Sequence, residues 1–407
     1  VRNELGLTPV ILGSPADKEA AQRMAAACPG LVSLAGDTRL PEAAAAFEAA
    51  IALDPRKGGA HYNLSRAVRF GPDDPRIARM QDLLAQTDLP AEDAMQIEFA
   101  LAKALDDLRQ PEAAFPHFAR ANALRRQAIA YSLPAEAAEM QRIRDAFPAP
   151  MAPLPPLAKP PARQPIFVLG MPRAGSTLVE QILSSHSLVE GTTELPDIPA
   201  LARRERNYPL SLPGLGAEQL ARRGEEFLQR TRIQRKTARP VFIDKLPNNW
   251  MHTVFIMLAL PNAKIVDARR HPLGCCFSNF KQHFARGQAF AYSLEDMGRY
   301  YADYVRLMAH LDQVQPGRVH RVIYERMVDD TEAEVRALLD YCGLPFEQAC
   351  LEFHRTERAV RTPSSEQVRR PIFREGTEAH VPFEPWLGPL KAALGPVLSA
   401  YPDAPAA

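Results

Sequence analysis

The chain has 407 residues and a mass of 45.1 kDa, with 49 basic and 48 acidic side chains and a formal net charge of +1. A single hydrophobic core stops growing at roughly 250–300 residues, so this length predicts two domains. The balanced charge excludes a bulk electrostatic attraction to nucleic acid or to an anionic membrane, and any anion must therefore be bound locally.

The cysteines and the apolar runs bear on where the protein works. Five cysteines, an odd count without metal-ligand spacing, favour a reducing compartment, and we expect a cytoplasmic protein. The most apolar run, residues 250–260, is shorter than the ~20 residues that a membrane-spanning helix needs, so we expect a buried helix there and no membrane span. The first residue is Val1 rather than Met, so the removal of an N-terminal leader stays an open alternative.

Residues 1–147 are rich in alanine and show helical periodicity. Phe47, Ala50 and Leu53 share one helical face, and the same spacing recurs 71 residues later from Phe118 (118 − 47 = 71). Two repeats of about 34 residues with a small insertion would give this offset. The stretch resembles tetratricopeptide repeats, and the alternative is an ordinary alanine-rich helical bundle. Either kind of helical domain would provide a surface that binds a partner rather than a catalytic site.

A proline-rich linker, residues 148–164, separates this region from residues 165–400. Beyond the linker, the short apolar runs PIFVLG, PVFID, AKIVDA and RVHRVIY alternate with helical stretches. This pattern is typical of an α/β domain, a parallel sheet covered by helices.

The stretch FVLGMPRAGSTLVEQIL, residues 167–183, nearly matches a phosphate-binding P-loop. Gly170 and Gly175 have the required spacing, but Ser176 stands where that loop has its lysine, and Thr177 follows. A strand, a turn and a helix N-terminus would still surround an anion with backbone N–H groups. The lysine of a P-loop contacts the β- and γ-phosphates, so its absence makes metal-assisted transfer of a γ-phosphoryl group difficult. A donor with one phosphate in the loop and a less charged transferable group needs neither lysine nor metal.

Five ordered motifs resemble those of sulfotransferases that use 3′-phosphoadenosine 5′-phosphosulfate (PAPS). GMPRAGSTLVEQIL resembles the family's 5′-phosphosulfate loop, FIDKLPNNW its lysine segment, ARRHPLGCCFSNF its 3′-phosphate element and VIYERMVDD a later segment. The fifth, SSEQVRRPIF, resembles a stretch of tyrosylprotein sulfotransferases and of bacterial relatives with tetratricopeptide arms. The resemblance covers residues 165 to about 398 and implies the sulfotransferase fold.

The resemblance also implies site residues. The donor would be held by Arg173, Ala174, Gly175, Ser176, Thr177, Arg270, Ser278 and Tyr324. The catalytic group would comprise Glu194, Lys245, Arg173 and Ser364. Two positions depart from the family pattern, since Ala174 replaces a serine of the loop and His380 stands where the family has tryptophan.

A base must accept the proton of the acceptor hydroxyl, and Glu194 is the preferred candidate. It lies in the segment after the loop helix, where the tyrosylprotein enzymes carry a catalytic glutamate. Glu190, His186 and His271 are the alternatives, and Glu194 could instead cap the next short helix.

The sequence therefore predicts a PAPS-dependent O-sulfotransferase without a metal, which would release adenosine 3′,5′-bisphosphate. Protein tyrosine is the preferred acceptor, held by the repeat domain, while carbohydrate, lipid and small-molecule hydroxyls stay open. The rivals are a P-loop kinase or NTPase, with Asp244 or Asp267 binding Mg²⁺, and a non-catalytic repeat scaffold. We expect no nucleic-acid partner, and a homodimer is an open alternative.

Overall fold

The computed structural model describes residues 10–11, 18–27, 32–33, 40–148, 151, 163–284, 287–356, 367–372 and 374–405. These residues form two compact units. The first comprises the described residues up to Ala130 together with those from Lys281 to Gly287, and the second comprises the remainder.

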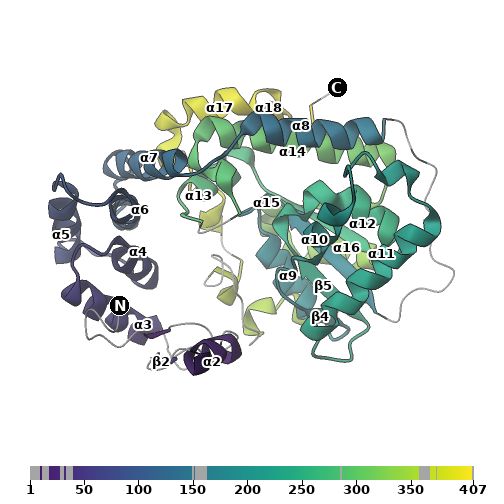
Figure 1. The fold of residues 1–407 in the computed structure, drawn as a ribbon, viewed down its shortest axis with the longest axis horizontal. Helices are drawn as coiled ribbons and strands as arrows, with labels where there is room; N and C mark the ends of the chain where they lie inside the picture. Colours follow the sequence, from purple (N-terminus) through teal and green to yellow (C-terminus); the bar gives the residue numbers. More distant parts are fainter. Residues whose placement is uncertain are drawn as a thin grey trace. The chain divides into compact units, whose positions relative to one another are not determined.

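The first unit is mainly helical (Figure 1). Its elements are β1 (Val10–Ile11), α2 (Lys18–Ala27), β2 (Val32–Ser33), α3 (Leu40–Leu53), α4 (Gly58–Ala67), α5 (Pro75–Leu84), α6 (Ala91–Asp107) and α7 (Pro111–Ala128). β1 and β2 form a short parallel pair. Helices α3, α5 and α7 begin 35 and 36 residues apart (75 − 40 and 111 − 75), which fits the predicted spacing. That these helices are tetratricopeptide repeats stays a prediction.

The buried face of α3 differs from the one that we predicted. Ala44 and Ile51 are buried and Phe47 packs against them, whereas Leu53 is 67% exposed. Leu53 follows Ile51 by two residues, about 200° around the helix, so it lies on the side away from the cluster that Ile51 forms with Ala60 and Leu64 of α4. In α7 the predicted Phe118 is indeed fully buried.

The second unit contains a five-stranded parallel sheet. The strands are β3 (Gln164–Gly170), β4 (Val189–Gly191), β5 (Val241–Lys245), β6 (Lys264–Arg269) and β7 (Val319–Ile323), in the order β4-β5-β3-β6-β7. β3, β5 and β6 are buried on both faces, which is why they read as continuous apolar runs. The predicted parallel sheet is confirmed, and β4 is a strand that we did not predict.

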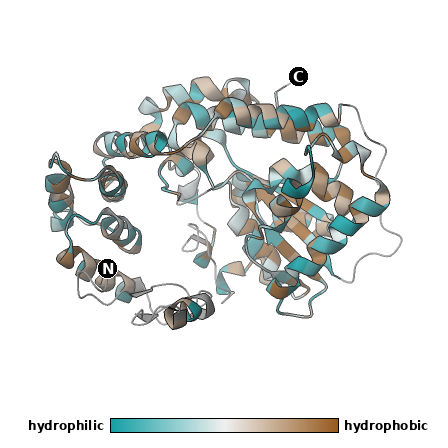
Figure 2. Ribbon diagram, in the orientation of Figure 1, coloured by the Kyte–Doolittle hydropathy of each residue, from teal (hydrophilic) through white to brown (hydrophobic). Residues whose placement is uncertain are grey.

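Helices cover both faces of this sheet, and apolar residues concentrate on the strands between them (Figure 2). The α-helices of this unit that follow β3 are α9 (Ser176–Ser184), α10 (Asp197–Arg204), α11 (Ala217–Arg230), α12 (Thr253–Ala259), α13 (Pro272–Phe280), α14 (Leu294–Val314), α15 (Tyr324–Asp329), α16 (Thr331–Cys342), α17 (Gly388–Leu394) and α18 (Pro396–Ala400), of which α17 packs against α14 rather than against the sheet. The expected buried helix at residues 250–260 is a 3₁₀ turn, Pro247–His252, that continues into α12.

Side-chain alternation along the strands identifies the two faces. Phe227 of α11 packs against Phe167 of β3 and Phe242 of β5, so α11 covers one face. Lys245 follows Phe242 by three residues in β5. Because side chains alternate between the faces of a strand, the side chain of Lys245 points to the face opposite to that of Phe242. Helix α9 covers that opposite face, as the contact between Lys245 and Glu180 shows.

Helix α8 (Leu133–Ala146) belongs to the second unit, although we placed it in a first domain ending at residue 147. Its buried residues Met140 and Ile143 lie on the side of the helix that packs against α14. The unit boundary therefore falls at residue 130, before this helix, and most of the proline-rich linker lies outside the described residues.

Two further findings concern the described residues only. No helix among them is both long and apolar enough to cross a membrane. Cys275, Cys276, Cys342 and Cys350 are free thiols, and Cys28 lies outside the described residues.

Candidate functional site

The loop between β3 and α9 adopts a backbone that its glycines permit. Gly170 has φ +126°, and a Cβ there would lie 2.3 Å from the carbonyl oxygen of Ala268 in β6. Gly175, with φ +101°, is the N-cap of α9 and supplies no side chain to the first N–H groups of the helix. These donors and the helix dipole are therefore directed at the loop, as an anion-binding turn requires.

The loop lies at the switch point of the sheet. β3 and β6 are neighbours, and the chain leaves β3 toward β4 on one side but continues from β6 to β7 on the other. Open α/β sheets bind ligands in the crevice at such a point, beyond the carboxyl ends of the strands. Arg173 follows β3 and Arg270 follows β6, so both arginines lie where the fold predicts a ligand.

The structure brings together five of the predicted donor residues. Arg173 has φ +65°, a strained value for a residue with a side chain, and its Nε donates to Ser278 Oγ at 3.0 Å. Arg270 donates from Nη1 to the carbonyl of Arg173 at 3.3 Å, and its guanidinium lies 5.0 Å from the ring centroid of Tyr324. A Cβ on Gly175 would lie 3.0 Å from the same tyrosine ring. The tyrosine thus closes over the loop.

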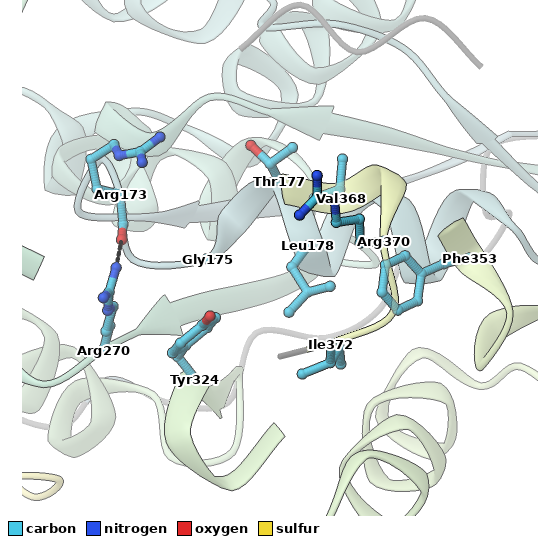
Figure 3. A pocket seen from close by; sticks show the side chains of 10 residues that line it. All are labelled: Arg173, Gly175, Thr177, Leu178, Arg270, Tyr324, Phe353, Val368, Arg370 and Ile372. Carbon is cyan, nitrogen blue, oxygen red and sulfur yellow. Dashed lines mark hydrogen bonds between the residues drawn. The ribbon is translucent and has the colours of Figure 1, made fainter. Parts of the chain in front are cut away.

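These residues surround a cavity of about 510 Å³, counting the part open to solvent. Figure 3 shows the side chains around it. The cavity is lined by Arg173, Gly175, Thr177, Leu178, Arg270, Tyr324, Phe353, Val368, Arg370 and Ile372. Ala174 is buried in the turn, and Ser176 opens α9 and is also buried.

Half of the lining residues were not predicted. Leu178, in the first turn of α9, faces the cavity. Three others, Val368, Arg370 and Ile372, come from the stretch SSEQVRRPIF. The two arginines of this stretch could have indicated an anion-binding site, but no role was predicted for them. Nothing in the sequence around Phe353 indicates a site.

Glu194 and Lys245 form a separate pair that does not line this cavity. Lys245 Nζ donates to Glu194 Oε1 at 2.5 Å and lies 4.0 Å from Glu180. The segment carrying Glu194 is fixed on both sides, because the hydroxyl of Thr192 donates to Ile243 and the side chain of Leu195 is 1% exposed. Helix α10 is capped by Pro196 without a side-chain bond, so Glu194 is not its cap.

The alternative bases have structural roles. The carboxylate of Glu190 accepts hydrogen bonds from the backbone N–H groups of Lys236 and Thr237 and from the Thr237 hydroxyl, at 2.9 Å and 2.8 Å for the two Thr237 donors. His186 is fully buried, with its Nε2 at 2.9 Å from the carbonyl of Pro345. Both side chains are buried, and neither lines the cavity.

His271 and His380 lie together next to Arg270. Their rings stack with centroids 5.5 Å apart, and the backbone N–H of His271 donates to Glu325 at 3.0 Å. Burial, together with His271 and Arg270, lowers the pKa of His380 to about 4. Burial also lowers the pKa of His271. Both rings are thus neutral at pH 7.

The two aspartates of the kinase alternative are not exposed to a metal. Asp267 is fully buried and contacts Arg269 and Arg321, each at 3.1 Å. Burial raises the pKa of Asp244 well above its ordinary value. Among the described residues, no group of three or more His, Cys, Asp or Glu side chains could hold a metal ion.

An anionic ligand fits the arrangement around Arg270. Its Nε is buried and has no hydrogen-bond partner within the described part of the chain, which is costly unless a ligand or water accepts from it. A Cβ on Gly274 in the first turn of α13 would lie 3.3 Å from this atom, so the glycine leaves room beside it. Ser364, the remaining predicted site residue, lies outside the described residues.

Residues 165–348 match the model of the sulfotransferase family. This segment begins within β3 and includes β4, β5, β6, β7 and the helices between them, and the first unit up to Ala130 lies outside it. An uncharacterized protein of Aquifex aeolicus (strain VF5) is 31% identical over 331 residues, which are 78% of this chain and 43% of that protein. The chain thus spans less than half the length of this relative.

Solved structures give weaker likenesses. The sulfotransferase domain from the curacin biosynthetic pathway is 18% identical, with a TM-score of 0.37, and the match covers 56% of this chain and 99% of that one. The sulfotransferase domain from the Synechococcus PCC 7002 olefin synthase is 21% identical, with a TM-score of 0.40, covering 56% and 90% of the two chains.

Proposed function

We propose that the protein transfers a sulfuryl group from PAPS to an acceptor hydroxyl. The observation that carries this proposal is the loop between β3 and α9, which directs a helix N-terminus and Arg173 at one cavity without the lysine of a P-loop. Arg270 and Tyr324 complete the cavity from the strands on the other side of the switch point. The family match over residues 165–348 supports the same chemistry.

The residues present would hold PAPS in two places. The N–H groups at the start of α9, with Arg173, would bind the 5′-phosphosulfate. Arg270 and Ser278 would bind the 3′-phosphate, for which the buried Nε of Arg270 supplies an unused donor. When bound, PAPS supplies a sulfuryl group, whose bond to a phosphate oxygen breaks as the acceptor oxygen binds sulfur.

Side chains of the protein would accept the proton of the acceptor hydroxyl and stabilise the charge on the leaving oxygen. Glu194 takes the proton of the acceptor hydroxyl, a role suited to its 47% exposed carboxylate. Lys245, held beside it, and Arg173 balance the charge that develops on the leaving oxygen. A protein tyrosine is the proposed acceptor, because a phenol with a pKa of about 10 gives up its proton to a carboxylate late in transfer.

A thermal-shift experiment tests the donor. Adenosine 3′,5′-bisphosphate should raise the melting temperature in EDTA, and ATP with Mg²⁺ should do so much less, because the loop has no lysine for a γ-phosphate. A larger shift with Mg-ATP would contradict the proposal and favour a kinase or NTPase.

The acceptor needs a separate experiment. The protein is incubated with PAPS and matched panels of tyrosine peptides, glycans and simple phenols, and mass spectrometry detects the added sulfate. We expect sulfate on the tyrosine peptides. Sulfate found on glycans or simple phenols alone would keep the sulfotransferase activity and overturn the protein-tyrosine acceptor.

A further inference from the structure

The amine of Lys245 lies between two carboxylates that come from different elements. Lys245 is the last residue of β5, Glu194 follows β4, and Glu180 lies in the second turn of α9. The amine is 2.5 Å from Glu194 and 4.0 Å from Glu180. Lys245 and Glu194 are expected site residues from the sequence, whereas Glu180 is not.

The two carboxylates differ in their access to water. The side chain of Glu194 is 47% exposed, whereas those of Glu180 and Lys245 are 4% and 2% exposed. Water can hydrate the exposed carboxylate of Glu194 when the amine moves away from it, whereas it cannot reach the buried carboxylate of Glu180 in the same way. If the amine has to leave one partner, Glu194 is therefore the one that it can leave.

The fold explains why Glu180 stays in place. Lys245 pairs in register with Val168 of β3, so its side chain points to the face of the sheet that α9 covers. Glu180 follows the anion-binding loop in the same helix, and its neighbours Val179 and Gln181 are also buried. The helix thus fixes the loop and this carboxylate together.

We propose that Glu180 is a positioning residue that anchors the Lys245 amine from inside the protein, so that Glu194 can release the amine and act as the base. This inference rests on the proposed function. The three groups carry two negative charges and one positive charge. When an anionic donor attracts the amine, Glu194 loses its partner and becomes a better proton acceptor, while Glu180 keeps the amine charged and in reach.

The variant Glu180→Gln tests this role because it removes the charge and keeps the size. Lys245 would then have Glu194 as its remaining carboxylate of the two and would hold it more tightly. We expect kcat to fall about 10- to 100-fold, in line with the loss of one charge-assisted contact. The affinity for adenosine 3′,5′-bisphosphate should stay equal or rise, because a negative charge has been removed. The acidic limb of the pH–kcat profile should move to lower pH, because a paired Glu194 is harder to protonate.

Two further variants separate positioning from folding. Glu180→Asp keeps the charge and should recover much of kcat. Glu190→Gln removes another buried carboxylate, the one bonded to Lys236 and Thr237, and should lower the melting temperature without moving the pH profile. An unchanged pH profile and an unchanged kcat per folded molecule in Glu180→Gln would overturn the proposal.

A double-mutant cycle decides the anchoring without using activity. If Glu180 anchors Lys245, the loss of melting temperature caused by Glu180→Gln should be smaller in a Lys245→Gln background than in the wild type. Additive losses would show that the two side chains do not interact, whatever the reaction. Absence of bisphosphate binding in the wild type would instead contradict the proposed function and leave the cycle interpretable.

Discussion

Arg270 connects three parts of the site through one guanidinium. It donates to the carbonyl of Arg173 and to the carbonyl of Gly376, and its plane lies against Tyr324. The resemblance of ARRHPLGCCFSNF to a 3′-phosphate element predicted this arginine. It did not predict that the guanidinium would also connect the loop to the segment around residue 376. Nε is buried and has no partner within the described residues, so a ligand could accept from it without breaking these bonds.

Replacing Arg270 with alanine should weaken binding of adenosine 3′,5′-bisphosphate about 10- to 100-fold, the value of a charge-assisted contact of roughly 1.5–3 kcal/mol. Adenosine 5′-monophosphate, which lacks the 3′-phosphate, should lose much less affinity. Isothermal titration of both ligands against the wild type and the variant measures the difference. Equal losses would mean that Arg270 acts through the loop rather than on the 3′-phosphate.

Changing Glu194 to Gln keeps the size of the side chain but removes its ability to accept a proton. We expect kcat to fall about 10²–10⁴-fold, while the affinity for the bisphosphate stays near that of the wild type. Since Glu194 does not cap α10, the melting temperature should change little. Near-normal kcat would show that another group is the base, and it would favour His271, which lies next to Arg270.

At the scale of elements, the turn between β3 and α9 depends on a close approach of two strands. A Cβ on Gly170 would lie 2.3 Å from the carbonyl oxygen of Ala268, and its φ of +126° is unfavourable for any other residue. This contact is what allows the loops after β3 and β6 to meet at one cavity.

Gly170→Ala should therefore lower the free energy of unfolding by at least about 1–3 kcal/mol and weaken bisphosphate binding as the loop moves. Gly388→Ala is the matched control, because nothing lies within 4 Å of a Cβ added at that position. Urea unfolding of the two variants compares them directly. Equal stability of both would mean that the loop relaxes without strain.

The sequence predicted the elements whose pattern is local. β3, β5, β6 and β7 were recognised because each apolar run is bounded by turn residues, and the loop because its glycines keep their spacing. β4 was missed because three residues, one of them a glutamate, carry too short a pattern. The partner of α8 was missed because Met140 and Ile143 define a buried face but not which helix covers it. The pairing of Lys245 with Glu180 depends on strand register, which a single sequence does not specify.

At the scale of the whole molecule, each unit has buried side chains of its own. Phe99, Leu101 and Phe118 are at most 1% exposed in the first unit, as are Phe167 and Ile265 in the second. Every residue that lines the cavity belongs to the second unit. A ligand in this cavity would therefore contact lining residues of the second unit.

This division predicts two calorimetric transitions that respond differently to the donor product. A ligand that binds only one folded unit stabilises that unit by about 2.7 kcal/mol at a hundredfold excess over Kd, which raises its transition temperature by several degrees. Adenosine 3′,5′-bisphosphate should thus raise the transition of the second unit and leave that of the first where it is. Gly170→Ala, which acts within the second unit, identifies its transition by lowering it. A single transition that rises as a whole would show that the two units unfold together and that the first unit shares in the energetics of binding.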